Sequence, residues 1–154
     1  MERNSERIVK QVNLAYYLIY TATILSTIIG YIITMNSQSS VNIQSSLSIT
    51  LSSVIILYIM ISIPTALALF HRNLKKWREI EDQFLKYKKY IAGAKLRLFI
   101  VGLGLVASVI AHFILYAGTP NMSMIACAGI SAVALIFCKP NAAKIASELD
   151  LDEE

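Results

Sequence analysis

Four long stretches of the chain lack charged side chains and consist mostly of apolar residues. They are residues 12–35, 47–70, 98–117 and 122–138. A membrane-spanning helix needs roughly 20 such residues, whereas apolar runs of about 10–14 are more typical of buried helices in soluble proteins. The pattern therefore predicts an all-α fold, a four-helix transmembrane bundle that forms a single integral membrane domain over residues 1–154.

The basic residues predict how this bundle is oriented. All 14 Lys and Arg residues lie before the first stretch, between the second and third, or after the fourth. With four spans, these three segments share one side of the membrane, and an excess of Lys and Arg marks the cytoplasmic side. We therefore expect a multi-pass protein of the cell membrane (inner or plasma), with both termini and the loop 71–97 in the cytoplasm.

The basic loop 71–97 has its own apolar pattern. Apolar and aromatic residues recur there at spacings of three and four, which is typical of one face of a helix. We expect an amphipathic cytoplasmic helix between spans 2 and 3, ended or bent at Gly93, or else a continuation of the second span. Such a helix can face anionic lipid headgroups or a partner, pack on its own bundle, or only set the topology. Its candidate lipid- or partner-facing residues are Lys75, Lys76, Trp77, Arg78, Lys86, Lys88 and Lys89.

The C-terminal tail, residues 139–154, is acidic. It can dock on the basic loop, because both lie on the same side, or it can be a solvated end. Chain ends rich in like charges are usually solvated, and we expect the second arrangement.

Hydroxyl-bearing residues form a stripe along the first stretch. At about 100° per residue, its members fall within about 60° of one line on a helix. The stripe favours an interhelical hydrogen-bond seam, or alternatively the lining of a polar pathway, because unpaired polar groups in hydrocarbon are costly. His112 of the third stretch lies at a similar depth to Tyr31, and we expect the two to share a hydrogen bond. The stripe residues, together with His112, are Tyr16, Tyr20, Thr23, Thr27, Tyr31 and Thr34.

Small residues form faces on the third and fourth stretches. Small residues spaced four apart let helix backbones approach closely in membranes. We expect them to pack these two helices together. The residues concerned are Gly104, Ser108, Ala111, Ala128 and Ala132.

The residues that catalysis or coupled transport require are missing from the four stretches. They contain no Asp, Glu, Lys or Arg, and the chain has no HExxH, CxxC or GxSxG motif. We therefore expect no enzymatic activity, cofactor, metal site or nucleic-acid partner. The favoured function is an accessory, regulatory or protective subunit that contacts the lipid bilayer and either itself or another membrane protein. The alternative is a small homo-oligomeric channel or carrier lined by the stripe.

Overall fold

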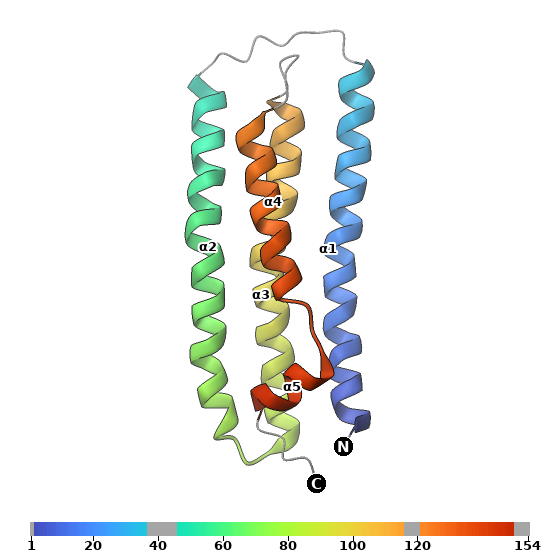
Figure 1. Cartoon of the computed structure of the whole chain (residues 1–154), viewed down its shortest axis with the longest axis vertical. Coiled ribbons are helices and arrows are strands. Elements are labelled where there is room, and N and C mark those ends of the chain that lie inside the picture. Colours follow the sequence, from blue (N-terminus) through green and yellow to red (C-terminus); the bar gives the residue numbers. More distant parts are fainter. Residues whose placement is uncertain (1, 37–45, 116–120, 150–154) are drawn as a thin grey trace.

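The computed structural model describes residues 2–36, 46–115 and 121–149, and the regular structure in these residues is helical. The long helices and the helix that follows them lie side by side along the long axis, and a short helix near the C-terminus lies across one end (Figure 1). The helices are α1 (Glu2–Asn36), α2 (Ser46–Arg78), α3 (Gln83–Ile114), α4 (Met122–Phe137) and α5 (Ala142–Leu149).

Three of these helices, α1, α2 and α3, are long and apolar enough to cross a membrane. These three helices agree with the prediction that the chain is a membrane protein. The predicted fourth span forms helix α4, but α4 has only 16 residues. At about 1.5 Å per residue this is roughly 24 Å, less than the roughly 30 Å of a bilayer core. The crossing by α4, and with it the count of four spans, stays a prediction.

Helix α3 occupies the centre of the bundle. Helices α1, α2 and α4 each pack against it, and α2 also contacts α4. Among the described residues, α1 packs on neither α2 nor α4. Buried positions recur along α3 at spacings of three and four, as expected of a helix with one core-facing side. They include Leu98, Val101, Leu105 and Ser108.

The basic loop does not form a separate amphipathic helix, so that prediction is wrong, whereas the second helix does continue into the loop, as the alternative predicted. Helix α2 continues to Arg78, and α3 already begins at Gln83. The break between them is stabilised by Asp82, whose carboxylate accepts a hydrogen bond from the backbone N–H of Phe84 at 2.9 Å, as helix N-caps do. Gly93 does not end a helix there. It lies within α3, where the Trp77 ring of α2 packs over it.

The start of α1, the turn between α2 and α3, and α5 all lie at one end of the molecule, the lower end in Figure 1. We call this the basic end. Helix α4 stops short of it, because Pro140 cannot continue a helix and also restricts the residue before it. Helix α5 then packs beside α1 and α2. The expected solvated tail is therefore wrong for residues 142–149, while residues 150–154 lie outside the described part of the chain.

Candidate functional site

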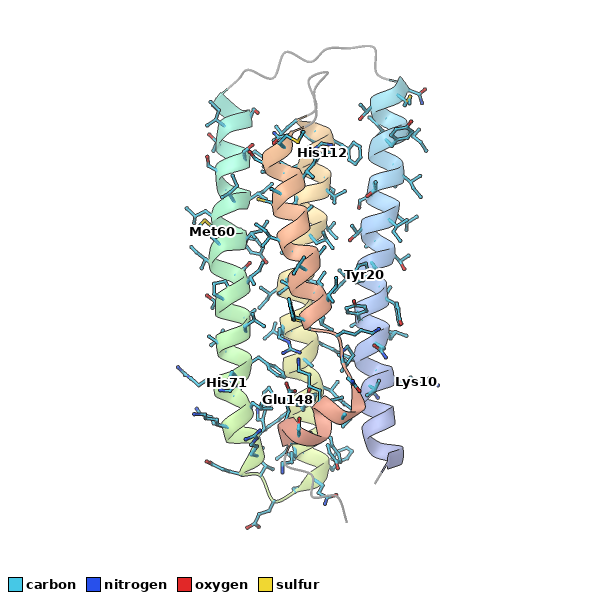
Figure 2. The ribbon with its side chains drawn as sticks, in the orientation of Figure 1. Lys10, Tyr20, Met60, His71, His112 and Glu148 are labelled. Carbon is cyan, nitrogen blue, oxygen red and sulfur yellow. The ribbon has the colours of Figure 1, made fainter. Side chains whose placement is uncertain are left out.

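The hydroxyl stripe of α1 does not lie on a single surface. Tyr16 is buried and Thr23 is half-buried, whereas Thr27 and Tyr31 are exposed. The stripe thus begins against the bundle near the basic end, is exposed at Thr27 and Tyr31, and is half-buried again at Thr34, which lines a groove between α1 and α3. Figure 2 shows Tyr20 on the side of α1 that faces the middle of the bundle.

The threonine hydroxyls of the stripe bond within their own helix. Thr23 donates to the carbonyl of Ile19 at 2.8 Å, and Thr27 donates to the carbonyl of Thr23 at 2.9 Å. Thr34 likewise donates to the carbonyl of Gly30 at 2.8 Å. Because each hydroxyl has a single proton to donate, these donors need no acceptor on another helix. This weakens the interpretation of the stripe as an interhelical hydrogen-bond seam.

Glycines and bulky side chains, not hydroxyls, make the close contact between α1 and α3. A Cβ atom built on Gly102 of α3 would lie 2.7 Å from the Cδ1 atom of Ile19. On α1, a Cβ atom built on Gly30 would overlap the ring of Phe113. These two contacts bring α1 and α3 close together at two levels. The sequence did not single out either glycine, because a glycine in an apolar helix carries no local sign of which neighbour fills its space.

Of the small residues predicted to pack α3 against α4, Gly104 lies close to both α4 and α2. Gly104, Ser108 and Ala111 are buried on α3, and a Cβ atom built on Gly104 would lie 3.4 Å from the Oγ atom of Ser131 on α4. Ser108 donates to the carbonyl of Gly104 at 2.7 Å. The two predicted residues of α4 are half-buried and pack against the core; they are Ala128 and Ala132.

His112 lies at the end of the bundle opposite the basic end (Figure 2). It is half-buried, and its ring stands edge-on to that of Phe113 with the centroids 5.2 Å apart. Tyr31 is 56% exposed. The hydrogen bond between His112 and Tyr31 stays a prediction.

Most of the residues that we predicted to face lipid or a partner are exposed at the basic end, but Trp77 is half-buried. Its ring centroid is 5.7 Å from that of Phe70 and 6.3 Å from that of Tyr90, in edge-to-face arrangements. Trp77 therefore packs between α2 and α3, where it contributes to the core. The exposed residues are Lys75, Lys76, Arg78, Lys88 and Lys89, and Lys86 is half-buried.

A buried arginine joins this aromatic cluster. Arg97 is only 8% exposed, and its guanidinium carbon lies 3.9 Å from the ring centroid of Phe70. Its Nε atom has no hydrogen-bond acceptor among the described residues. Burying a cation is costly, and an aromatic face offsets part of that cost. In the sequence, Arg97 is one of several basic residues that set the predicted orientation in the membrane. The one signal that distinguishes it is its position as the last charged residue before the third apolar stretch.

Helix α5 closes the basic end through both apolar and polar contacts. Ile145 and Leu149, one turn apart, are each 0% exposed. Arg78 donates from Nε to the carbonyl of Glu148 at 2.7 Å and from Nη2 to the carbonyl of Ser147 at 3.2 Å. Tyr90 donates from its hydroxyl to the Glu148 carboxylate at 2.5 Å. A cation on the last carbonyls of a helix satisfies otherwise unpaired acceptors and complements the helix dipole.

Two grooves lie between α1 and α3. One, of about 580 Å³, lies at the basic end and is lined mainly by apolar and aromatic residues, with Lys88 among them. The other, of about 330 Å³, lies towards the opposite end, and its lining includes Ser26, Gly30 and Phe113. Within residues 2–36, 46–115 and 121–149, no three His, Cys, Asp or Glu side chains are placed to hold a metal ion.

Comparison with known proteins identifies no relative of this chain at a significant level. The chain matches no protein-family model, no curated protein and no solved structure at a significant level.

Proposed function

We propose that this protein is a non-enzymatic, multi-pass membrane subunit that acts in an accessory, regulatory or protective role by binding another membrane protein. The unequal burial of its long helices carries this proposal. Only 6% of the most apolar window of α1 is buried, compared with 44% for α3. Thr27 and Tyr31 lie on the exposed part of α1. Hydroxyl-bearing side chains of membrane helices are enriched where helices meet, so a partner helix is a better cover for this face than lipid alone.

In the proposed orientation, the basic end lies in the cytoplasm and the chain crosses the cell membrane four times. The convergence of the basic segments at one end of the fold supports this arrangement, because Lys and Arg are retained on the cytoplasmic side. The short α4 crosses with local thinning of the bilayer, as helices shorter than the hydrocarbon layer do. The exposed lysines of the basic end then lie near anionic lipid headgroups.

The alternative function is a homo-oligomeric channel or carrier. The exposure of Thr27 and Tyr31 on α1 favours it, since copies arranged in a ring can turn these hydroxyls towards a common centre. A route between α1 and α3 of a single chain is disfavoured, because Ile19 packs on Gly102 and Phe113 packs on Gly30 there. The alternative therefore requires several copies.

The test is the composition of the complex in its native membrane. The tagged protein is extracted gently, and a photo-crosslinking residue replaces Thr27 on the uncovered face of α1. The matched control carries the crosslinker at Met60, which is 72% exposed on α2 and points away from the bundle (Figure 2). We expect a second, different protein at fixed stoichiometry, crosslinked from position 27 and not from position 60. Crosslinks only between copies of this chain would support the channel instead, and a monomer without crosslinks would contradict both functions.

A further inference from the structure

The groove of about 580 Å³ at the basic end lies between the start of α1 and the start of α3. We call it the basic-end groove. Helix α1 contributes Ile8 and Gln11 to its lining, and α3 contributes residues that include Phe84, which is 76% exposed, and the exposed Lys88. Large apolar side chains that stay open to solvent mark a surface for a ligand or a membrane. The lining thus favours an occupant that is partly apolar.

The groove lies directly beside the apolar stretches of both helices. Gln11 immediately precedes the first stretch, and Ile91 lies seven residues before the third, which is about 10 Å along a helix. The two helices run the same way from the basic end, and Ile19 packs on Gly102. The polar layer on each side of a bilayer core is roughly 5–8 Å thick. In the proposed orientation, the groove therefore reaches from the headgroup layer to the edge of the hydrocarbon.

The α3 side of the groove is basic. Between residues 83 and 97, α3 carries five basic residues and no acidic one. Lys88 and Lys95 are exposed, and neither has an ion-pair partner among the described residues. The acidic residues of the chain lie at the start of α1, in the turn that ends at Asp82, and from residue 148 onwards. This side of the groove therefore complements an anionic occupant.

The acidic tail of the chain is anchored away from Lys88. The end of α5 is held by Arg78 of α2, which donates to the carbonyl of Glu148, and by Tyr90 of α3, which donates to the Glu148 carboxylate. At about 100° per residue, Lys88 lies about 160° around α3 from Tyr90. The described part of the tail therefore does not cover Lys88, and residues 150–154 lie outside the described part of the chain.

An exposed apolar surface continues from the groove along α3. Phe99 is 63% exposed and Leu103 is 48% exposed. At about 100° per residue, both lie within about 80° of arc around the helix with Lys88 and Lys95. Exposed cations are thus followed by exposed apolar side chains, which is the order of a charged headgroup and its acyl chains. A soluble acidic peptide would match the cations but not the apolar surface beyond them.

We propose that the basic-end groove binds one anionic phospholipid, with its headgroup between Lys88 and Lys95 and an acyl chain along Phe99. This inference rests on the proposed function, because it requires the basic end to face the cytoplasm. Basic pockets between membrane helices on that side bind anionic headgroups. The lipid contacts both α1 and α3, and it thereby holds α1 in the position from which its uncovered face meets a partner.

The test is native mass spectrometry of the full-length protein in detergent, titrated with phosphatidylglycerol or with phosphatidylcholine that has the same acyl chains. We expect each chain to retain one phosphatidylglycerol and to bind phosphatidylcholine at least fivefold more weakly. Lys88→Gln should weaken phosphatidylglycerol binding about fivefold, as expected for one basic residue beside an anionic lipid. The matched control is Lys89→Gln, because Lys89 is exposed but does not line the groove. This control should leave binding unchanged.

Filling the groove distinguishes a built site from diffuse attraction by charge. Gln11→Trp places a large ring in the groove and keeps every lysine, and it should also weaken phosphatidylglycerol binding about fivefold. The matched control is Leu14→Trp, at a position that is 65% exposed and does not line the groove. This control should leave binding unchanged, and circular dichroism shows that each variant remains folded.

Four results would overturn the inference. They are equal binding of the two lipids, equal weakening by Lys88→Gln and Lys89→Gln, unchanged binding in Gln11→Trp, and binding only after removal of residues 150–154. The last result would assign the groove to the chain's own tail. None of them bears on crosslinking from position 27, so the inference can fail while the proposed function stands.

Discussion

The basic end and the opposite half of the bundle are held together by different contacts. At the basic end, the Phe70 ring lies edge-to-face against Trp77 and Tyr90 and also contacts the Arg97 guanidinium. Helix α5 is held there by hydrogen bonds to its Glu148. In the opposite half, α1 meets α3 where Phe113 packs over Gly30. The hydroxyls of α1 there bond to its own backbone.

The difference follows from the solvent expected around each half. Lipid tails are as apolar as the side chains they contact, so helices in a bilayer associate through shape and close approach of their backbones. In water, apolar burial itself drives association, and unpaired polar groups can be satisfied by solvent until a partner replaces it. The basic end thus has the features of a small aqueous core. The opposite half has the features expected within a membrane.

The largest expected effect is at the basic end, with Phe70→Ala. This change removes a ring that contacts Trp77, Tyr90 and Arg97 at once, and it leaves a cavity beside a buried cation. Loss of a buried phenylalanine typically costs about 3–5 kcal/mol. Unfolding in mixed detergent micelles, followed by circular dichroism, measures the loss. The neighbouring Leu69→Ala, at a position 45% exposed, is the control, and equal losses for the two variants would show that the aromatic cluster is not a core.

An intermediate effect is expected in the opposite half, with Gly30→Ala. The added methyl group overlaps the Phe113 ring, and overpacking of this kind costs about 1–3 kcal/mol. The matched control is Gly129→Ala on α4, because a Cβ atom there meets nothing within 4 Å. The control should not lose stability, since alanine is the better helix former. A harmless Gly30→Ala would mean that α1 and α3 do not depend on close approach.

The smallest effect is expected from the double change of Thr23 and Thr27 to Val. Both hydroxyls donate within α1, so the loss should stay below the roughly 0.6 kcal/mol typical of an interhelical hydrogen bond in a membrane. Thr21→Val is the control, because Thr21 is exposed and makes the same kind of bond, to the carbonyl of Tyr17. A loss as large as that of Gly30→Ala would restore the hydrogen-bond seam. Unchanged stability with altered solute flux would instead favour the channel.

Much of the fold could be predicted from the chain alone, and the exceptions have identifiable causes. The three long apolar helices follow from runs without charge, which is a local property. The break between α2 and α3 was missed, because the apolar spacing continues through it and only the cap at Asp82 marks the boundary. The docking of α5 is not predicted, because the acidic character of the whole tail, residues 139–154, favours solvation. The partners of α5, Arg78 and Tyr90, also lie far away in the sequence.

The residues of the candidate site likewise fall into those that a local pattern identifies and those whose role depends on distant neighbours. Gly104 and Ser108 can be identified as candidates from their spacing, which depends only on the helical period. Gly30 and Gly102 were not found, since their role depends on the bulky side chains opposite them. The sequence identifies Arg97 only as one of the basic residues that set the topology, and its burial against Phe70 depends on the tertiary structure.

By itself, the sequence determined that this chain forms long apolar helices with its positive charge gathered in three segments, because helix length and charge placement depend on neighbouring residues. Only the tertiary structure decided which faces meet: that α3 lies at the centre, that α1 packs on α3 but on neither α2 nor α4 in the described residues, and that α5 covers the basic end. A helical period defines the faces of each helix, but their pairing depends on how side chains distant in the chain fit together in space.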